Sequence, residues 1–142
     1  MNGYTKGYLD DCRSRIAEQV AAYKALAAAS KAHATASPRR FEAVLEAFAL
    51  HFFNSMVLAL DGHLVHRSRA IEKKDGNSLN QVRMLSSSIM TNDSVMFADK
   101  TIKYDPVTAV LKFRVGDKVV LKESEFTRLG TPFFAEIEAE YL

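Results

Sequence analysis

Polar side chains that could carry out chemistry recur at helical spacing in the middle of the chain. At about 100° per residue they fall on one face of a helix whose other side is apolar, and they comprise His51, Asn54, Ser55, Asp61, His66 and Arg69. We call these residues the polar stripe. Helix faces that point into water usually carry lysine and glutamate, but this face has neither between Glu46 and Glu72. We therefore predict that the stripe lines a pocket or an interface, with an ordinary solvent face as the alternative.

Two kinds of chemistry are open to the stripe. A carboxylate such as Asp61 near His66 would orient the imidazole as a general base. Asp61, His63 and His66 also offer mixed oxygen and nitrogen ligands to a divalent metal, but no second cluster in the sequence supplies further ligands. Because this set is incomplete, we expect no metal and no cofactor. A hydrolase or metal-binding enzyme built on the stripe is kept as an alternative function with no assigned catalytic residue.

Positive charge gathers in the basic segment, residues 66–83, which overlaps the end of the stripe. Its candidate phosphate-binding residues are Arg67, Arg69, Lys73, Lys74 and Arg83. The simplest account is that such cations offset the partial negative charge at a helix C-terminus. A nucleic-acid site would align several cations with stacking aromatic rings between them, and this segment lacks the rings. Binding of phosphate or RNA is therefore an alternative, and we do not favour nucleic acid as the partner.

A long helix must position the stripe, and turn signals set its bounds. Ser37 suits an N-cap and Pro38 suits a first helical position, so we predict a helix from Pro38 or Arg39 to about Lys73, where a polar turn over residues 74–78 ends it. An alanine-rich amphipathic helix should precede it, from about Thr5 to about Ala34.

Two further kinds of element should follow. A third helix begins at a cap formed by Asn77 or Ser78, and its apolar face is Leu79, Val82, Leu85 and Ile89. After Asn92 the hydrophobic period changes from about 3.6 to 2. Runs over residues 101–105, 109–115 and 118–121, separated by polar turns, predict an antiparallel meander. Residues 123–142 then predict a helix interrupted near Gly130.

The predicted fold class is α+β in one domain, residues 1–142. Residues 1–92 form a bundle of three N-terminal helices, and residues 93–142 form a small three-stranded antiparallel β-meander with a C-terminal helix. The chain has 48% hydrophobic and 25% charged residues and a net charge of +2, which suits a globular protein and not a disordered chain or a DNA-coating protein. Cys12 is the only cysteine, which excludes an intrachain disulfide.

Residues 41–65 are long and apolar enough to span a bilayer. They also contain side chains that are costly in hydrocarbon, namely Glu42, Glu46, His51, Asn54 and Asp61. The N-terminal stretch has charged residues where a signal peptide would be apolar. We therefore expect a soluble, cytoplasmic protein without a membrane partner, in which residues 41–65 form a largely buried helix.

Parts of the sequence resemble two known families. The first is an uncharacterised bacterial family in which helices precede a short β region. The similarity lies in residues 61–85 and in the tail from Ala98 through residues 115–117 to residues 133–138. This resemblance covers residues 40–142 and implies a fold but no chemistry. The helical half also resembles the HEPN class of nucleotide- and RNA-associated bundles. Its nuclease members place an arginine before a histidine, whereas here His66 precedes Arg67 and Arg69.

These observations do not assign a function to the chain. The leading hypothesis is a non-enzymatic interaction or regulatory module of bacterial origin that self-associates into a homo-oligomer. The alanine-rich first helix and the polar stripe would form much of the contact, because small side chains let a second helix approach closely.

Overall fold

The computed structural model describes residues 4–33, 38–68 and 71–142. Its helices are α1 (Lys6–His33), α2 (Pro38–His63), a short 3-10 helix (Val65–Ser68), α3 (Ser78–Thr91) and α4 (Glu123–Glu140). Within the described ranges there is no β-strand, and the only strand-like pairing is an isolated antiparallel bridge between Val95 and Lys118. The predicted α+β class is therefore wrong and the fold is all-helical, although the predicted helical bundle is confirmed.

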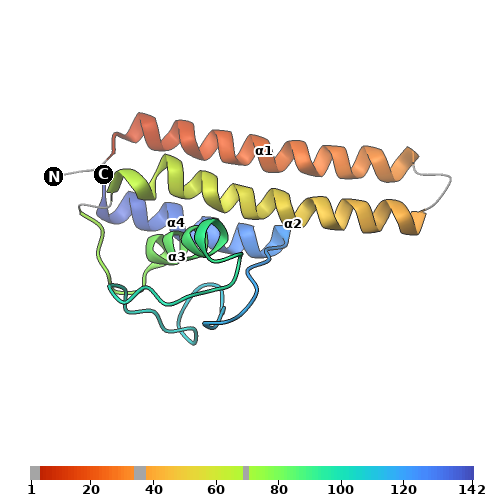
Figure 1. Ribbon diagram of the computed structural model, residues 1–142. Helices are drawn as coiled ribbons and strands as arrows, with labels where there is room; N and C mark the ends of the chain where they lie inside the picture. Colours follow the sequence, from red (N-terminus) through yellow and green to blue (C-terminus); the bar gives the residue numbers. More distant parts are fainter. Residues whose placement is uncertain (1–3, 34–37, 69–70) are drawn as a thin grey trace.

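Helices α1 and α2 form a long antiparallel hairpin, and α3 and α4 lie against only one half of it (Figure 1). The other half projects beyond them and consists of residues 19–33 of α1 and 38–52 of α2. We call this projecting half the arm. The start of α1 and the C-terminus lie at the opposite end of the hairpin (Figure 1). The molecule therefore has a packed body and an arm built from α1 and α2, which α4 touches only at its base, where Lys24 pairs with Glu123.

The core lies where the second half of α2 meets α3 and α4. Side chains from all three helices are fully buried there, among them Phe53, Leu60, Leu64, Leu79, Val82, Leu85, Leu129, Phe133 and Ile137. Burying each large apolar side chain stabilises the fold by roughly 1.5–3 kcal/mol. The predicted apolar face of α3 is confirmed, with Ile89 half-buried at its edge.

Local capping signals explain how α3 begins and α2 ends. The Asn77 side chain accepts a hydrogen bond from the Asn80 N–H at 3.1 Å, so Asn77 is the predicted N-cap. Helix α2 ends at His63 instead of Lys73, because the Tyr4 and Tyr8 hydroxyls donate to the carbonyls of Leu64 and His63. The polar stripe therefore does not lie on one helix, since His66 belongs to the 3-10 helix.

Helix α4 runs without the predicted interruption. Gly130 and Pro132 both lie inside it. Pro132 lacks an N–H and each of these residue types disfavours a helix interior. The helix nevertheless continues because Phe126, Phe133 and Ile137 anchor both of its halves in the core.

The segment between α3 and α4 keeps the predicted alternation but forms no sheet. Its inward side chains are buried, among them Met96, Ile102, Leu111, Val119 and Leu121. The backbone finds partners other than a neighbouring strand. Leu111 exchanges two hydrogen bonds with the Gln81 side chain, and the Tyr104 hydroxyl donates to the Phe113 carbonyl at 2.6 Å. Alternation thus predicted which side chains face inward. Side chains on α3 and in the loops, however, take the place of the neighbouring strands as hydrogen-bond partners of the backbone.

Helix α2 is buried in only one of its halves, so the expectation of a largely buried helix is wrong. Arg39–His63 is long and apolar enough to cross a membrane, and only 22% of its most apolar window is buried. Val44 and Phe48 on the arm are exposed, whereas Phe53, Val57 and Leu60 are fully buried in the body. The second half of α2 is thus a core helix, whereas the first half keeps large apolar side chains exposed to solvent.

Candidate functional site

The described members of the polar stripe differ in their exposure and in their partners. His51, Ser55, His63 and His66 are exposed, whereas Asn54 and Asp61 are half-buried. Asn54 donates from its Nδ2 to the Val119 carbonyl at 3.0 Å, and Asp61 accepts from the Ser86 hydroxyl at 3.1 Å. Arg69 lies outside the described residues. The half-buried Asn54 and Asp61 therefore attach the 118–122 segment and α3 to α2, which is a structural role.

The described residues hold no cluster of metal ligands. No group of three or more His, Cys, Asp and Glu side chains in the described part of the chain has a geometry that could hold a metal ion. Asp61 has a hydroxyl partner on α3, while His63 at the last position of α2 and His66 in the 3-10 helix are exposed. The described members of the stripe thus offer no general acid–base pair and no ligand set.

The described cations of the basic segment face carboxylates. Lys73 pairs with Glu140 at 2.8 Å, and Lys74 pairs with Glu72 at 2.8 Å. Arg83 also pairs with Glu72. The Arg67 side chain and Arg69 lie outside the described residues. Lys74 and Arg83 share the buried Glu72 carboxylate, which a phosphate would have to displace. Among the described Lys and Arg side chains of this segment, only the more exposed Lys73 is loosely held.

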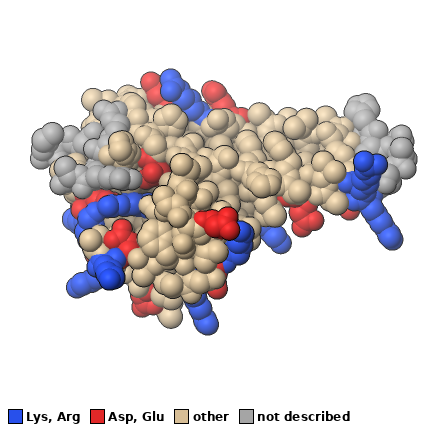
Figure 2. All heavy atoms as spheres, in the orientation of Figure 1, with Lys and Arg blue, Asp and Glu red and all other residues tan. Residues whose placement is uncertain are grey.

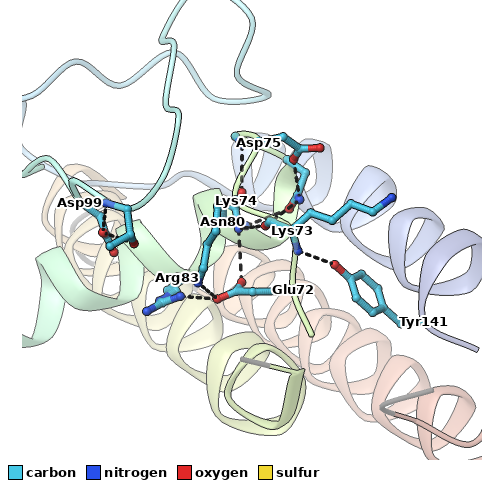
Figure 3. A network of polar contacts seen from close by, with 11 residues as sticks. Glu72, Lys73, Lys74, Asp75, Asn80, Arg83, Asp99 and Tyr141 are labelled. Atoms are coloured by element: carbon cyan, nitrogen blue, oxygen red, sulfur yellow. Dashed lines mark hydrogen bonds and ion pairs between the residues drawn. The ribbon is translucent and has the colours of Figure 1, made fainter. Parts of the chain in front are cut away.

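Glu72 is the centre of this network, as Figure 3 shows. Its side chain is fully buried and accepts from Lys74, Arg83 and, at 3.3 Å, Asn80. Asn80 also donates to the Lys73 carbonyl at 2.8 Å and accepts from the Gly76 N–H at 2.9 Å. A buried carboxylate is tolerated when several donors satisfy it. The network thus fixes the connection between α2 and α3.

The same connection is held from the other side by the loop after α3. The Lys103 N–H donates to the Lys74 carbonyl at 3.0 Å. Gly76 has φ +89°, and a Cβ there would lie 2.2 Å from the Lys103 carbonyl oxygen. Only glycine fits that approach. Nearby, hydrogen bonds from Thr101 lower the pKa of Asp99, with Arg83 and Lys74 contributing more weakly.

Three large apolar side chains on the arm are exposed, although the α2 helix was expected to be largely buried. Leu26, Val44 and Phe48 are 53%, 62% and 46% exposed. Tyr23 stacks on Phe48 and Phe52 with ring centroids 6.4 and 5.4 Å apart. On the face shown in Figure 2, the arm is largely without charged side chains between the body and its tip.

This apolar surface is hollowed between the two helices. A hollow of about 220 Å³ is lined by Gln19, Ala22, Tyr23, Leu26, Phe48 and Phe52. We call these residues the arm patch. Leu26 and Phe48 thus border the same depression from opposite helices. In the sequence, this surface is indicated by the helical spacing of Phe41, Leu45, Phe48 and Phe52. That spacing identifies one apolar face of a helix but does not show whether another element covers the face.

Comparison with known proteins finds no family model, no curated protein and no solved structure that matches this chain. The two family resemblances noted in the sequence therefore stay predictions.

Proposed function

We propose that this protein is a self-associating helical module and that two copies meet through the arm patch. The observation that carries the proposal is the exposed apolar surface shared by α1 and α2, with Leu26 and Phe48 each about half exposed at 53% and 46%. Contiguous apolar surface of this kind marks a contact site. The polar stripe contributes less than the sequence suggested, because Asn54 and Asp61 already bind the body.

A second copy is an occupant that the charges allow. The arm has the cations Lys24, Lys31, Arg39 and Arg40 and the carboxylates Glu42 and Glu46, a net charge of +2. Lys24 pairs with Glu123 of α4, so only a small uncompensated charge opposes pairing with a second copy. A two-fold axis through the patch would place the same two-helix layer on both sides, giving a four-helix arrangement in which Leu26 and Phe48 are covered.

The size of the arm limits the strength of this contact. An arm of 15 residues per helix is about 22 Å long and roughly two helix diameters of 10 Å wide, so its flat face covers about 450 Å². Stable interfaces bury about 800 Å² on each partner. We therefore expect a reversible, concentration-dependent dimer and not an obligate one.

Charge introduced on the patch tests where the contact lies. Phe48→Glu should lower the dimer fraction by about tenfold or more, because a carboxylate would be buried against apolar side chains. Val107→Glu is the matched control, since Val107 is 75% exposed and lies outside the arm. Light scattering coupled to size exclusion measures both, and circular dichroism confirms that each variant folds.

Two results would contradict the assignment of the patch. One is an equal dimer fraction for Phe48→Glu and Val107→Glu. The other is a wild-type chain that stays monomeric but binds uncharged phosphatidylcholine vesicles through Phe48, because then a lipid surface and not a second copy would cover the arm.

A further inference from the structure

A second apolar depression lies between α1 and α4, apart from the arm patch. It is a groove of about 550 Å³ whose walls include Ile16 and Val20 from α1 and Phe126 and Phe134 from α4. Three of these side chains are buried and Val20 is half-buried. Ala17, Gly130 and Ala135 also line the groove, and their small size leaves the space open.

Each end of the groove is bridged by an ion pair between the two helices. Arg13 pairs with Glu138 at 2.6 Å, and its guanidinium lies 5.1 Å from the centroid of the Phe134 ring. Lys24 pairs with Glu123 at 3.1 Å. Arg13 and Lys24 are eleven residues apart on α1, so the groove is about 16 Å long at about 1.5 Å per residue. The groove is thus bounded in length as well as in width.

These dimensions select the kind of occupant. A helix lying along the groove would have to open both ion pairs that cross it. The volume instead lies within the range of about 300–1,000 Å³ typical of small-molecule sites, which have apolar walls and a few polar groups. An elongated apolar molecule fits the groove better than a protein segment.

The two ends differ in how firmly their cations are held. Arg13 has both a carboxylate and an aromatic ring as partners. Lys24 has one carboxylate partner, and its side chain is 60% exposed. An ion pair so exposed contributes little to stability, so the Lys24 ammonium can exchange Glu123 for an anion on a ligand at little cost. The Lys24 end is therefore suited to a negatively charged headgroup.

We propose that the groove between α1 and α4 binds a single-chain anionic amphiphile of the fatty-acid class. Its chain lies along Ile16, Val20, Phe126 and Phe134, and its carboxylate pairs with Lys24. This site is independent of self-association, because it shares no lining residue with the arm patch.

A displacement titration tests the chain-binding part of the proposal. The full chain is titrated with dansyl-labelled undecanoic acid, and unlabelled dodecanoic acid then displaces the probe below its micelle concentration. Ala135→Leu fills the groove and should weaken probe binding by about tenfold or more. Ala139→Leu is the matched control, since Ala139 is an exposed alanine on the same helix outside the groove. Melting followed by circular dichroism shows that both variants fold.

The headgroup is tested by comparing dodecanoic acid with dodecanol as competitors. The wild type and Lys31→Ala should prefer the acid, whereas Lys24→Ala should bind acid and alcohol equally. A wild-type chain without saturable probe binding, or equal affinities for Ala135→Leu and Ala139→Leu, would overturn the site. An acid preference that persists in Lys24→Ala would overturn the assignment of the headgroup.

Discussion

At the scale of single residues, the buried carboxylate of Glu72 is the partner of both Lys74 and Arg83, two of the candidates for phosphate binding in the sequence. Arg83 lies eleven residues from Glu72, across a turn that places them together only once α3 has docked. Spacing along a helix carries no information on such a pairing. The spacing of the polar stripe likewise could not show the partners of Asn54 and Asp61, since these lie on later elements.

Removing the charge of Glu72 should therefore be costly. Glu72→Gln leaves Lys74 and Arg83 without their carboxylate in a partly buried site, and we expect a loss of about 3 kcal/mol in the free energy of unfolding. Glu140→Gln is the control, because the Lys73–Glu140 pair is 57% and 41% exposed and its loss should be hardly measurable. Urea unfolding of both variants gives the comparison. Equal stabilities would show that the Glu72 network does not hold the α2–α3 connection.

A second prediction at this scale concerns pH. Burial raises the pKa of Glu136 above its ordinary value of 4.5, and the nearby Glu140 and Asp75 raise it further. The folded chain thus binds this proton more tightly than the unfolded chain, so stability falls as pH rises from that ordinary value through the raised pKa.

Glu136→Gln mimics the protonated form and should raise Tm at neutral pH, with the advantage vanishing below about pH 4. Tm measured against pH for both proteins checks this. An advantage that persists unchanged in acid would not come from the Glu136 charge.

At the scale of elements, prediction succeeded where the signal is local. The helix Lys6–His33 and the start of α3 at its Asn77 cap follow from periodicity and capping within a few residues. The prediction of a meander was wrong because alternation specifies an inward face but not a hydrogen-bond partner for the backbone. Gln81 on α3 supplies hydrogen bonds that a neighbouring strand would have made. The predicted end of α2 was wrong because the actual end is set by Tyr4 and Tyr8, some 60 residues away in sequence.

Helix α4 gives a prediction of its own. Gly130 lies inside the helix, and a Cβ placed there meets no atom within 4 Å. Gly130→Ala should therefore stabilise the protein by up to about 1 kcal/mol, because alanine loses less backbone entropy than glycine. A thermal melt measures the gain. Gly76→Ala is the contrast and should destabilise, since the φ there is +89° and the site is closed by Lys103. A Gly130→Ala chain that melts lower would show that the helix is not continuous there.

At the scale of the whole molecule, α2 is shared between a packed body and an arm with exposed apolar side chains. Half of α2 builds the core with α3 and α4, while the other half packs mainly on α1 (Figure 1). Composition could not reveal this division, because Phe48 on the arm and Phe53 in the core belong to one apolar run. The difference between them depends on where α3 and α4 end, which is a property of the fold and not of α2.

Self-association through the arm is the central claim, and sedimentation velocity of the unmodified chain tests it most directly. We predict a reversible dimer whose weight-average sedimentation coefficient rises with concentration between the micromolar and the submillimolar range, as the limited area of the arm requires. A sedimentation coefficient that stays at the monomer value over that whole range would contradict the account.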